Sequence, residues 1–536
     1  MSLKNYVIWW TARRIYSQNR NRILPAVFVT GLLAFSFTTA SELSDTEAHG
    51  KQIYLTGTSP DGSPITAFLG VDQIKLPASV VPCGSCHGID GRGRPEGGVV
   101  PSDVTWSELS KGYGHEHDFG RRHPAFDEKS LAVSIIGGTD SAGNKLNVAM
   151  PRYHMKPDDI EALVAYLKRI EDDLDPGINE HAVTVGTLLP LTGSAASQGH
   201  AVRAVLMAFI REINAGGGVN GRRVELEVIP LGASSAETVA NVQAAISSPG
   251  LFAMVAAYIP GTDTQLLALL ADMKIPVVGP LSRTPDVASD RLQQAFYLYS
   301  GTPELMQSLA RFALTDVSAE QDRQVVVGPD SELLRKFSEQ LVAQGNRPTV
   351  TLPYARNKFE PATTMALLND TDDVFFLGSA AELDGLIAAL AGSKTWPRVF
   401  LPAAAVSRQM LQAAVEFDDR IFIAFPTQPS DVNDGGRELF ARLAANEELP
   451  ATQIASQVSA VAAAKILVEA MQAAGHALSR ERLVAELEGM HGYVTGLTPP
   501  VSFGLNRRIG ARGAHIVRVD LSSGLLIPAA AWANLP

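Results

Sequence analysis

The C-terminal two thirds of the chain alternates short β-branched runs with longer stretches rich in alanine and leucine. Residues 183–189, 325–327 and 374–378 have the length of buried strands, and helical periodicity follows each of them. Strands that alternate with helices form parallel sheets covered by helices on both faces. The pattern therefore predicts an α/β region with doubly wound parallel sheets over residues 182–536.

Residues 45–172 show a different pattern, with short helices in a chain rich in glycine, histidine and proline. The clearest predicted helix begins at Pro157, which suits a first helical turn, and two acidic residues follow it at the positive end of the helix dipole. One face of this helix carries an apolar stripe, formed by Ile160, Leu163, Val164, Leu167 and Ile170. We expect a small all-α domain in which this helix packs against residues 50–54, where Gly50 allows a close crossing.

An acidic stretch with proline and glycine, residues 173–181, separates the two patterns. Proline and glycine end regular structure and are typical of exposed connections. We therefore interpret residues 173–181 as a linker between two kinds of domain.

The N-terminus has the order of a secretory signal: a basic stretch to Arg22, an apolar run over residues 23–37, and small residues up to Ala40. The apolar run is shorter than the roughly 20 residues that cross a bilayer as a helix. We expect residues 1–40 to be a signal peptide and the protein to be periplasmic, with an uncleaved inner-membrane anchor as the alternative. The pair Arg13 and Arg14 is poorly placed for twin-arginine export, which favours the general secretory route.

Charge and cysteine content exclude several classes of protein. The formal net charge is −11 at pH 7, and residues 1–40 hold only basic charges, so the remainder is strongly acidic. Such a protein is a poor binder of nucleic acid. The chain has two cysteines, Cys83 and Cys86, which leaves no framework of structural disulfides.

The sequence Cys83-Gly84-Ser85-Cys86-His87 carries the clearest chemistry of the chain. Two thiols three residues apart on a helical turn can each form a thioether with one haem vinyl group, while the adjacent imidazole lies beneath the iron. A chance match or a redox CxxC pair is the alternative interpretation. The export signal and the glycine-rich segment that follows favour one covalently bound haem c.

The second axial ligand of the iron should come from a later loop. Met150 is the best candidate because Pro151 follows it and a predicted helix begins a few residues later. A thioether there would raise the reduction potential and close the iron to small molecules. The rival candidates remain open at this point, and they are Met155, His154, His115, His117 and His123.

These features together resemble the class I cytochromes c, over residues 45–172. The resemblance rests on a first helix with a small residue at its crossing, the CxxCH sequence, the Met-Pro loop and a terminal helix with the pair Tyr166 and Leu167. It implies that Cys83 and Cys86 attach the haem and that His87 and Met150 are axial ligands. Arg92 could contact a haem propionate or lie in solvent.

Residues 190–199 form a loop of small residues between a predicted strand and a long predicted helix. Such a loop exposes backbone N–H groups at the edge of a sheet where ligands bind in α/β folds. A nucleotide site is one interpretation of the nearby glycines, but the run 216–218 follows a helix where a nucleotide loop would precede one.

The region 182–536 resembles the periplasmic binding proteins of the branched-chain amino-acid type, the substrate receptors of ABC importers. The resemblance rests on the Pro-Leu-Thr-Gly loop from Pro190, the Glu-Ile-Asn-Ala-Gly-Gly helix end from Glu212, and the sequence from Ile275 to Pro280. It implies a type I periplasmic binding protein with two α/β lobes that close on a ligand between them. We expect lobe 1 over about residues 182–300 and 427–497, and lobe 2 over about 301–426 and 498–536.

The resemblance also indicates where a ligand would bind. The candidate ligand-binding residues are Gln198, Tyr258, Gly261, Thr262, Ser282, Arg283, Ser379 and Phe425. The family binds an α-ammonium group with a tyrosine and an acid of the second lobe, and here Ser379 and Ala403 occupy those positions. An ammonium ion in a closed cleft without a carboxylate would be strongly disfavoured, so we expect an uncharged or anionic ligand rather than a standard amino acid.

The sequence contains no nucleophile-base arrangement or metal-spaced histidine motif, and we do not expect an enzyme. We expect an electron carrier and ligand-binding protein, which exchanges single electrons with a periplasmic redox partner such as a quinoprotein dehydrogenase or a terminal acceptor. The alternative is the receptor of an ABC importer, working with its permease, or a ligand sensor, in either case with an added haem domain.

Overall fold

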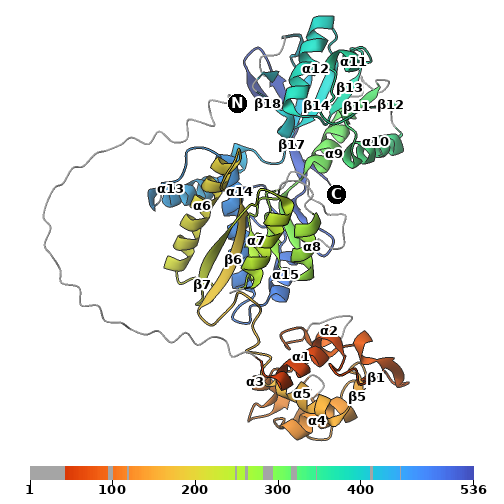
Figure 1. The fold of residues 1–536 in the computed structure, drawn as a ribbon, viewed down its shortest axis with the longest axis vertical. Helices are drawn as coiled ribbons and strands as arrows, with labels where there is room; N and C mark the ends of the chain where they lie inside the picture. The colour runs from red at the N-terminus through yellow and green to blue at the C-terminus, as the bar shows by residue number, and fades with distance from the viewer. Residues whose placement is uncertain are drawn as a thin grey trace, which may run out of the picture. The chain divides into compact units, whose positions relative to one another are not determined.

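The computed structural model describes residues 43–535 except 94–99, 118–119, 248–249, 260–263, 282–293, 316–322, 346, 408, 411–414 and 447. The predicted signal segment, residues 1–40, lies outside the described residues. The chain divides into two compact units between Glu180 and His181, and the first unit also takes in the short segment His476–Glu481. We call them the N-terminal unit and the C-terminal unit, and we describe each by itself (Figure 1).

Two crossing helices, α1 (Asp45–Thr56) and α5 (Pro157–Leu167), form the centre of the N-terminal unit (Figure 1). The helix α1 begins with a capping box, in which the Ser44 hydroxyl accepts from the backbone N–H of Glu47 and the Glu47 carboxylate accepts from the N–H of Ser44. At the crossing, a Cβ atom on Gly50 would lie only 2.0 Å from the carbonyl oxygen of Ala162. The predicted helix from Pro157 and its close crossing at Gly50 are both confirmed.

The other elements of the N-terminal unit are short. Its helices are α2 (Cys83–His87), α3 (Trp106–Leu109) and α4 (Glu128–Gly137), with a 3-10 turn η3 (Ala78–Val80). Strand β1 (Thr66–Leu69) pairs antiparallel with both β2 (Ile74–Pro77) and β5 (Arg152–His154), and β3 (His115–Glu116) pairs with β4 (Arg122–His123). The unit is mainly helical, as predicted, with these two small sheets in addition.

The first lobe of the C-terminal unit is built on a six-stranded parallel sheet. In spatial order its strands are β16 (Ile509–Ala511), β10 (Ala295–Tyr299), β9 (Val277–Val278), β8 (Ala253–Val255), β6 (Ala182–Leu189) and β7 (Arg223–Pro230). Its helices are α6 (Ala196–Ala215), α7 (Ser235–Ser247), α8 (Thr264–Asp272), α13 (Asp434–Asn446), α14 (Ile454–Ala473) and α15 (Arg480–Glu488). Helix α14 packs against α6, whereas α7 packs against α8 (Figure 1).

The second lobe has an eight-stranded sheet with a parallel part and an antiparallel edge. Its parallel strands are β12 (Thr349–Tyr354), β11 (Gln324–Pro329), β13 (Asp373–Phe376), β14 (Arg398–Pro402) and β15 (Ile421–Phe425). The antiparallel strands are β17 (Gly513–Asp520), β18 (Leu525–Pro528) and β19 (Ala533–Asn534). The helices that follow the parallel strands and the crossing are α9 (Thr302–Ala313), α10 (Glu332–Gln344), α11 (Pro361–Met365) and α12 (Ala380–Ser393).

The chain passes between the two lobes three times. The first crossing follows β10, the second follows β15, and the third joins β16 to β17 at Arg512. Because β16 pairs with β10, residues 509–511 belong to the first sheet, whereas the sequence-based boundary placed everything from residue 498 in lobe 2. The polar loops before β16 hid this short strand from the sequence pattern.

One helix in the described part of the chain, α14, is long and apolar enough to cross a membrane. Most of it is buried inside the first lobe, where Val461, Leu467 and Met471 have at most 2% of their surface exposed. Its apolar composition is explained by this burial in the lobe.

Candidate functional site

The CxxCH sequence forms the five-residue helix α2, so both thiols and the imidazole come from a single helical turn. Cys83 is half-buried and Cys86 is exposed, and both are free cysteines. Burial raises the pKa of the Cys83 thiol to about 12. The spacing predicted for a double thioether attachment is thus present on one short turn.

The imidazole of His87 is held in an orientation that suits an iron ligand. Its Nδ1 lies 2.8 Å from the carbonyl oxygen of Ser102, and since a carbonyl can only accept, Nδ1 carries the proton. The Nε2 lone pair of the neutral ring is then available to a metal. Burial lowers the pKa of His87, which favours this neutral form.

Two buried tyrosines hold the ends of the α2 turn, and sequence reasoning missed both. The Tyr54 hydroxyl on α1 donates to the carbonyl oxygen of Gly88 at 2.7 Å, directly after His87. The Tyr153 hydroxyl on β5 donates to the carbonyl oxygen of Val81 at 2.6 Å, two residues before Cys83. Burial raises the pKa of both phenols, so the two donors stay protonated.

The glycine-rich segment after His87 folds back against the same turn. The N–H of Gly93 donates to the carbonyl oxygen of His87 at 2.7 Å, and a Cβ on Gly93 would lie 2.2 Å from the carbonyl oxygen of Pro101. Arg92 lies 3.7 Å from a carboxylate oxygen of Asp103 and 3.7 Å from one of Glu171. The sequence left open whether Arg92 contacts a haem propionate or lies in solvent. In the structure, carboxylates of the chain itself lie near it.

Met150 lies in a loop that the next strand organises. It is half-buried and is not among the members of the described hydrophobic cluster, whereas Met155 packs against that cluster. The Arg152 guanidinium on β5 donates to the carbonyl oxygens of Leu146, Asn147 and Met150. These contacts distinguish a core methionine, Met155, from one left outside the core, Met150.

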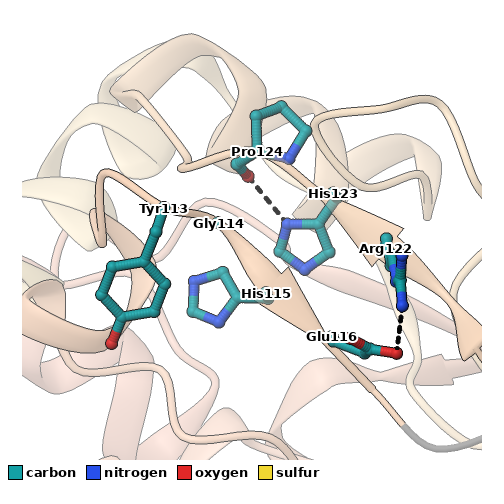
Figure 2. A pocket seen from close by; sticks show the side chains of 7 residues that line it. All are labelled: Tyr113, Gly114, His115, Glu116, Arg122, His123 and Pro124. Atoms are coloured by element: carbon teal, nitrogen blue, oxygen red, sulfur yellow. Dashed lines mark hydrogen bonds and ion pairs between the residues drawn. The ribbon is translucent and has the colours of Figure 1, made fainter.

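The rival histidines have other neighbours. His154 is exposed and its ring lies 4.8 Å from that of Phe68. His115 and His123 face each other on the paired strands β3 and β4, with ring centroids 4.8 Å apart (Figure 2). The Nε2 atoms of His117 and His123 lie 2.8 Å apart, and His123 Nδ1 donates to the carbonyl oxygen of Pro124.

His115, His117 and His123 form a histidine cluster. Two of its members, His115 and His123, border a pocket of about 650 Å³ that Tyr113, Glu116 and Arg122 also line (Figure 2). Burial and the neighbouring Arg121 cation lower the pKa of His117, which favours a hydrogen-bonded neutral pair. Among the described residues, no group of three histidine, cysteine or acidic side chains is arranged to hold a metal ion. Within the cluster, His117 and His123 are hydrogen-bonded, whereas the buried Nε2 atom of His115 has no partner in the described part of the chain, and the cluster lies apart from α2 along the chain.

The residues of α2 fit a covalently bound haem. Free thiols stand three residues apart on one turn, and a neutral imidazole with a fixed tautomer follows them. This donor set, rather than any one residue, is the observation that matches the cofactor.

The candidate ligand residues of the C-terminal unit are only partly within the described chain. Gly261, Thr262, Ser282 and Arg283 lie outside the described residues. Gln198, at the start of α6, donates to the Ser456 hydroxyl of α14 at 3.0 Å. Tyr258 follows β8 and is half-buried.

Two further candidates, Ser379 and Phe425, lie at the carboxyl edge of the second sheet. Phe425 ends β15 and is half-buried, and Ser379 follows β13. Ser379 caps α12, where its hydroxyl accepts from the N–H of Glu382. The described residues therefore place Gln198 and Tyr258 on the first lobe, and Ser379 and Phe425 on the second.

A carboxylate that the sequence analysis missed lies at this second edge. Glu382 Oε2 accepts from the Ser379 N–H, the Ser379 hydroxyl and the Tyr354 hydroxyl at 2.7, 2.8 and 3.0 Å. Ala403, which the sequence analysis placed at the position of the family's acid, lies in the 3-10 turn η7 (Ala403–Ala405). An S-x-x-E sequence before an apolar run is the signal for a capping box that would have found Glu382.

Polar residues join the segments that cross between the lobes. The Tyr299 hydroxyl lies 3.5 Å from that of Ser459, and burial raises the pKa of Tyr299 to about 12. His515 Nε2 lies 2.9 Å from a carboxylate oxygen of Asp431. A second pocket, of about 410 Å³ between α6, α13 and α14, is lined by none of the candidate ligand residues.

Comparison with known families identifies both units. The family of periplasmic binding proteins matches residues 182–524, which is more than half of the chain. The chain belongs to the periplasmic binding protein family. The cytochrome c family matches residues 80–171 of the N-terminal unit, so this binding protein carries a cytochrome c domain.

Solved structures agree with the fold of the binding-protein unit. A branched-chain amino acid ABC transporter protein from Thermus thermophilus with bound valine has a TM-score of 0.54 and 15% identity, covering 67% of this chain and 98% of its own. A fatty acid ABC transporter substrate-binding protein from Thermomonospora curvata has a TM-score of 0.51 and 16% identity, with 67% and 94% coverage. A putative branched-chain amino acid ABC transporter protein from Rhodospirillum rubrum gives 0.52 and 16%, with 65% and 99% coverage. At these identities the likeness shows the fold alone.

A comparison with curated proteins gives no match. The two family assignments still define the general role of this periplasmic binding protein. A cytochrome c domain implies haem c and electron transfer, and the binding-protein unit implies a small ligand. Both families are typically periplasmic, and neither points to a classical enzyme.

Proposed function

We propose that this protein transfers single electrons through one haem c, attached by Cys83 and Cys86, with His87 and Met150 as its axial ligands. The observation that carries the proposal is the His87 imidazole, whose Nδ1–H donates to Ser102 and whose Nε2 is left for the iron. When bound, the haem supplies an iron that alternates between the ferric and ferrous states. The protein's own part is to fix the ligands and to exclude other molecules from the iron.

The contacts around α2 support this role of the protein in fixing the ligands. A five-residue helix has few hydrogen bonds of its own. Hydrogen bonds from Tyr54, Tyr153 and the N–H of Gly93 therefore help to fix the position of α2. Arg152 holds the carbonyl oxygens of the Met150 loop. As a ligand, Met150 would exclude small molecules from the iron and favour electron transfer over oxygen chemistry.

The haem assignment is tested on the full-length protein produced with its export and maturation system. We expect haem to remain attached after acid denaturation, and to be lost from the Cys83→Ala, Cys86→Ala double variant. We expect Met150→Ala to remove the near-infrared charge-transfer band of ferric, methionine-ligated haem. Retention of this band in Met150→Ala, or haem attached without the two cysteines, would contradict the ligand set.

For the binding-protein unit we propose a small ligand without an α-ammonium group, such as a carboxylate, an aromatic acid or a small amide. Ala403 offers no charge at the position of the family's acid, and the Glu382 carboxylate accepts from three groups of the protein. A cation bound without a free carboxylate would lose hydration without compensation.

The ligand class is tested by a thermal-shift screen on the haem-loaded protein, with absorption spectra recorded alongside. We expect organic acids or amides to raise the melting temperature of the C-terminal unit and standard amino acids to leave it unchanged. Stabilisation by leucine or valine would overturn this part of the proposal. It would direct attention to Glu382 as the group that binds the ammonium ion.

A redox partner is also part of the proposal. Pairing a cytochrome c domain with a ligand-binding unit supports a carrier for the oxidation of a small alcohol or acid by a quinoprotein dehydrogenase. The test is the rate of haem reduction by a candidate dehydrogenase with and without the ligand found in the screen. A ligand that changes neither this rate nor the haem potential would show that the two units act independently.

The second candidate function is that of an ABC-importer receptor, or a ligand sensor, with an appended haem domain. The family match over residues 182–524 favours it. Stimulation of a permease's ATPase activity by the ligand-loaded protein, unchanged in the Cys83→Ala, Cys86→Ala variant, would support the receptor. For either function we propose export by the general secretory route, with residues 1–40 as a cleaved signal or as an inner-membrane anchor.

A further inference from the structure

Strand β5 connects two segments of the cytochrome c domain that are far apart in the sequence. Tyr153, in the middle of β5, has 4% of its surface exposed, and its hydroxyl donates to the carbonyl oxygen of Val81 at 2.6 Å. Val81 directly precedes Pro82, the residue before Cys83. This hydrogen bond therefore joins β5 to the start of the haem-attachment turn.

The position of the α2 turn depends on such outside contacts. The turn is five residues long, and Pro82 at its N-cap supplies no backbone N–H. Three hydrogen bonds fix its C-terminal end. Tyr54 donates to the carbonyl oxygen of Gly88, His87 Nδ1 donates to the carbonyl oxygen of Ser102, and the N–H of Gly93 donates to the carbonyl oxygen of His87. The Tyr153 contact acts at the opposite end of the turn.

The other side of β5 leads directly to Met150. Arg152 on β5 holds the preceding loop, because its guanidinium donates to three carbonyl oxygens, including that of Met150. Directly after β1, the N–H of Gly70 donates to the carbonyl oxygen of Val148 in the same loop at 3.2 Å. The backbone of Met150 is thus fixed relative to β5, and β5 is fixed relative to α2 through Tyr153.

We infer that Tyr153 is a positioning residue for the haem iron, because its hydroxyl links the segment that carries Met150 to the segment that carries Cys83 and His87. The inference rests on the proposed ligation of the iron by His87 and Met150. Tyr153 contacts neither ligand through this hydrogen bond; it sets how far the Met150 loop can move from α2. Losing the hydroxyl frees the loop to withdraw, which weakens the bond between Met150 and the iron.

The consequence is competition at the iron. A methionine thioether is a weak ligand that an external imidazole displaces when the loop can move away. A hydrogen bond of ordinary strength is worth about 1 kcal/mol net, which converts to roughly a fivefold change in an equilibrium constant. Removal of the Tyr153 hydroxyl should therefore make imidazole bind to the ferric iron roughly fivefold more tightly.

The experiment compares the haem-loaded full-length protein with its Tyr153→Phe and Tyr166→Phe variants. Tyr166 is a matched control: it is also a buried tyrosine of the same domain, and its hydroxyl donates to the Asp173 carboxylate and not to the backbone near α2. Imidazole is titrated into each ferric protein, and the near-infrared charge-transfer band and the reduction potential are recorded. We expect tighter imidazole binding, a weaker band and a lower potential in Tyr153→Phe alone.

Each other result overturns the inference. Equal imidazole affinities in Tyr153→Phe and the unmodified protein would show that the hydroxyl does not set the loop, and equal effects of the two variants would show a general loss of packing. A Tyr153→Phe protein that fails to acquire haem would also contradict it, because attachment should survive. A Met150→Ala variant separates this failure from that of the proposed function: if it binds imidazole no more tightly than the unmodified protein, Met150 is not the ligand.

Discussion

The cytochrome c domain and the binding-protein unit achieve order in different ways. In the second lobe, Val325, Val326 and Val327 of β11 are fully buried between layers of helices, and the long helices α10 and α12 follow β11 and β13. In the cytochrome c domain, α2 has five residues and is held by hydrogen bonds from side chains of other elements. Both units thus have an apolar core, but the α2 turn of the cytochrome c domain also depends on hydrogen bonds from other elements.

This difference shows what the cofactor is expected to add. Strongly exposed apolar side chains occur in both units, for example Val80 at 62% in the cytochrome c domain and Leu505 at 75% in the binding-protein unit, so they do not distinguish the two. The two free thiols and the half-buried His87 lie on a turn with few internal contacts. We therefore expect a group bound at this turn to stabilise the cytochrome c domain.

Removal of the haem tests the difference between the two units most directly. We expect the Cys83→Ala, Cys86→Ala variant to lower the melting temperature of the cytochrome c domain by roughly 10–20 °C, because a tightly bound group that is lost on unfolding stabilises the folded state. Scanning calorimetry of the full-length protein should show the second transition, from the binding-protein unit, unchanged. A shift of both transitions would mean that the two units do not unfold independently.

The second change acts on the binding-protein unit alone. Asp373 is fully buried and accepts from Arg347 at 2.6 Å and from Arg398 at 2.7 Å. Removing its charge leaves the guanidinium groups of Arg347 and Arg398 without their carboxylate, and Asp373→Asn should cost about 3–5 kcal/mol of unfolding free energy. Denaturant titration should find this loss with the haem spectrum intact.

The matched control for Asp373 is an exposed ion pair of the same lobe. Glu332 and Lys336 lie 2.8 Å apart on α10, and both side chains are largely exposed. Solvent screening makes such pairs weak, so Glu332→Gln should change stability by less than about 0.5 kcal/mol. Similar losses for the two variants would contradict the importance of burial.

The third change tests the helix crossing of the cytochrome c domain. A Cβ on Gly50 would lie 2.0 Å from the Ala162 carbonyl oxygen, so Gly50→Ala should push α1 from α5 and cost about 2 kcal/mol. Gly137 on α4 is the control, because the nearest atom to its added Cβ is 4.0 Å away. Gly137→Ala should stabilise the helix by about 0.5 kcal/mol, and thermal unfolding should therefore find opposite signs.

Sequence patterns predicted those features that depend on residues close together in the chain. The CxxCH spacing, the helix from Pro157 and the strand-helix alternation are all local, and the structure contains each of them. The helix crossing at Gly50 was also predictable, because a small residue opposite an apolar stripe is a local sign of close packing.

The features that could not be predicted join distant segments. The Tyr153 hydroxyl bonds to a carbonyl 72 positions away, and that of Tyr54 to one 34 positions away; backbone acceptors leave no mark in the sequence. Glu382 was not predicted, because the resemblance to the family placed the expected acid at Ala403. The strand β16 was not predicted because a strand of three residues after a polar loop carries too little pattern.

A smaller effect concerns pH and distinguishes the two units again. The pKa of His117 in the folded cytochrome c domain lies below its ordinary value of 6.5, mainly because of burial. The unfolded chain then binds more protons, so this contribution to stability is complete above pH 6.5 and is lost as the pH falls below it. Thermal unfolding between pH 7.5 and 5 should show a smaller acid loss in His117→Gln, and equal slopes would contradict the shift.

The smallest expected effect separates two roles of a predicted ligand residue. Ser379 accepts from the Glu382 N–H at the start of α12 and donates to the Glu382 carboxylate at 2.8 Å. Loss of an N-cap of this kind costs about 1 kcal/mol, so Ser379→Ala should lower the stability of the binding-protein unit by that amount. Ser331 caps α10 in the same lobe, where its hydroxyl accepts from the Leu334 N–H. Ser331→Ala should cause a similar loss, and only Ser379→Ala should also weaken ligand binding in the same calorimetric assay. If both variants bind ligand as the unmodified protein does, Ser379 serves the helix and not the cleft.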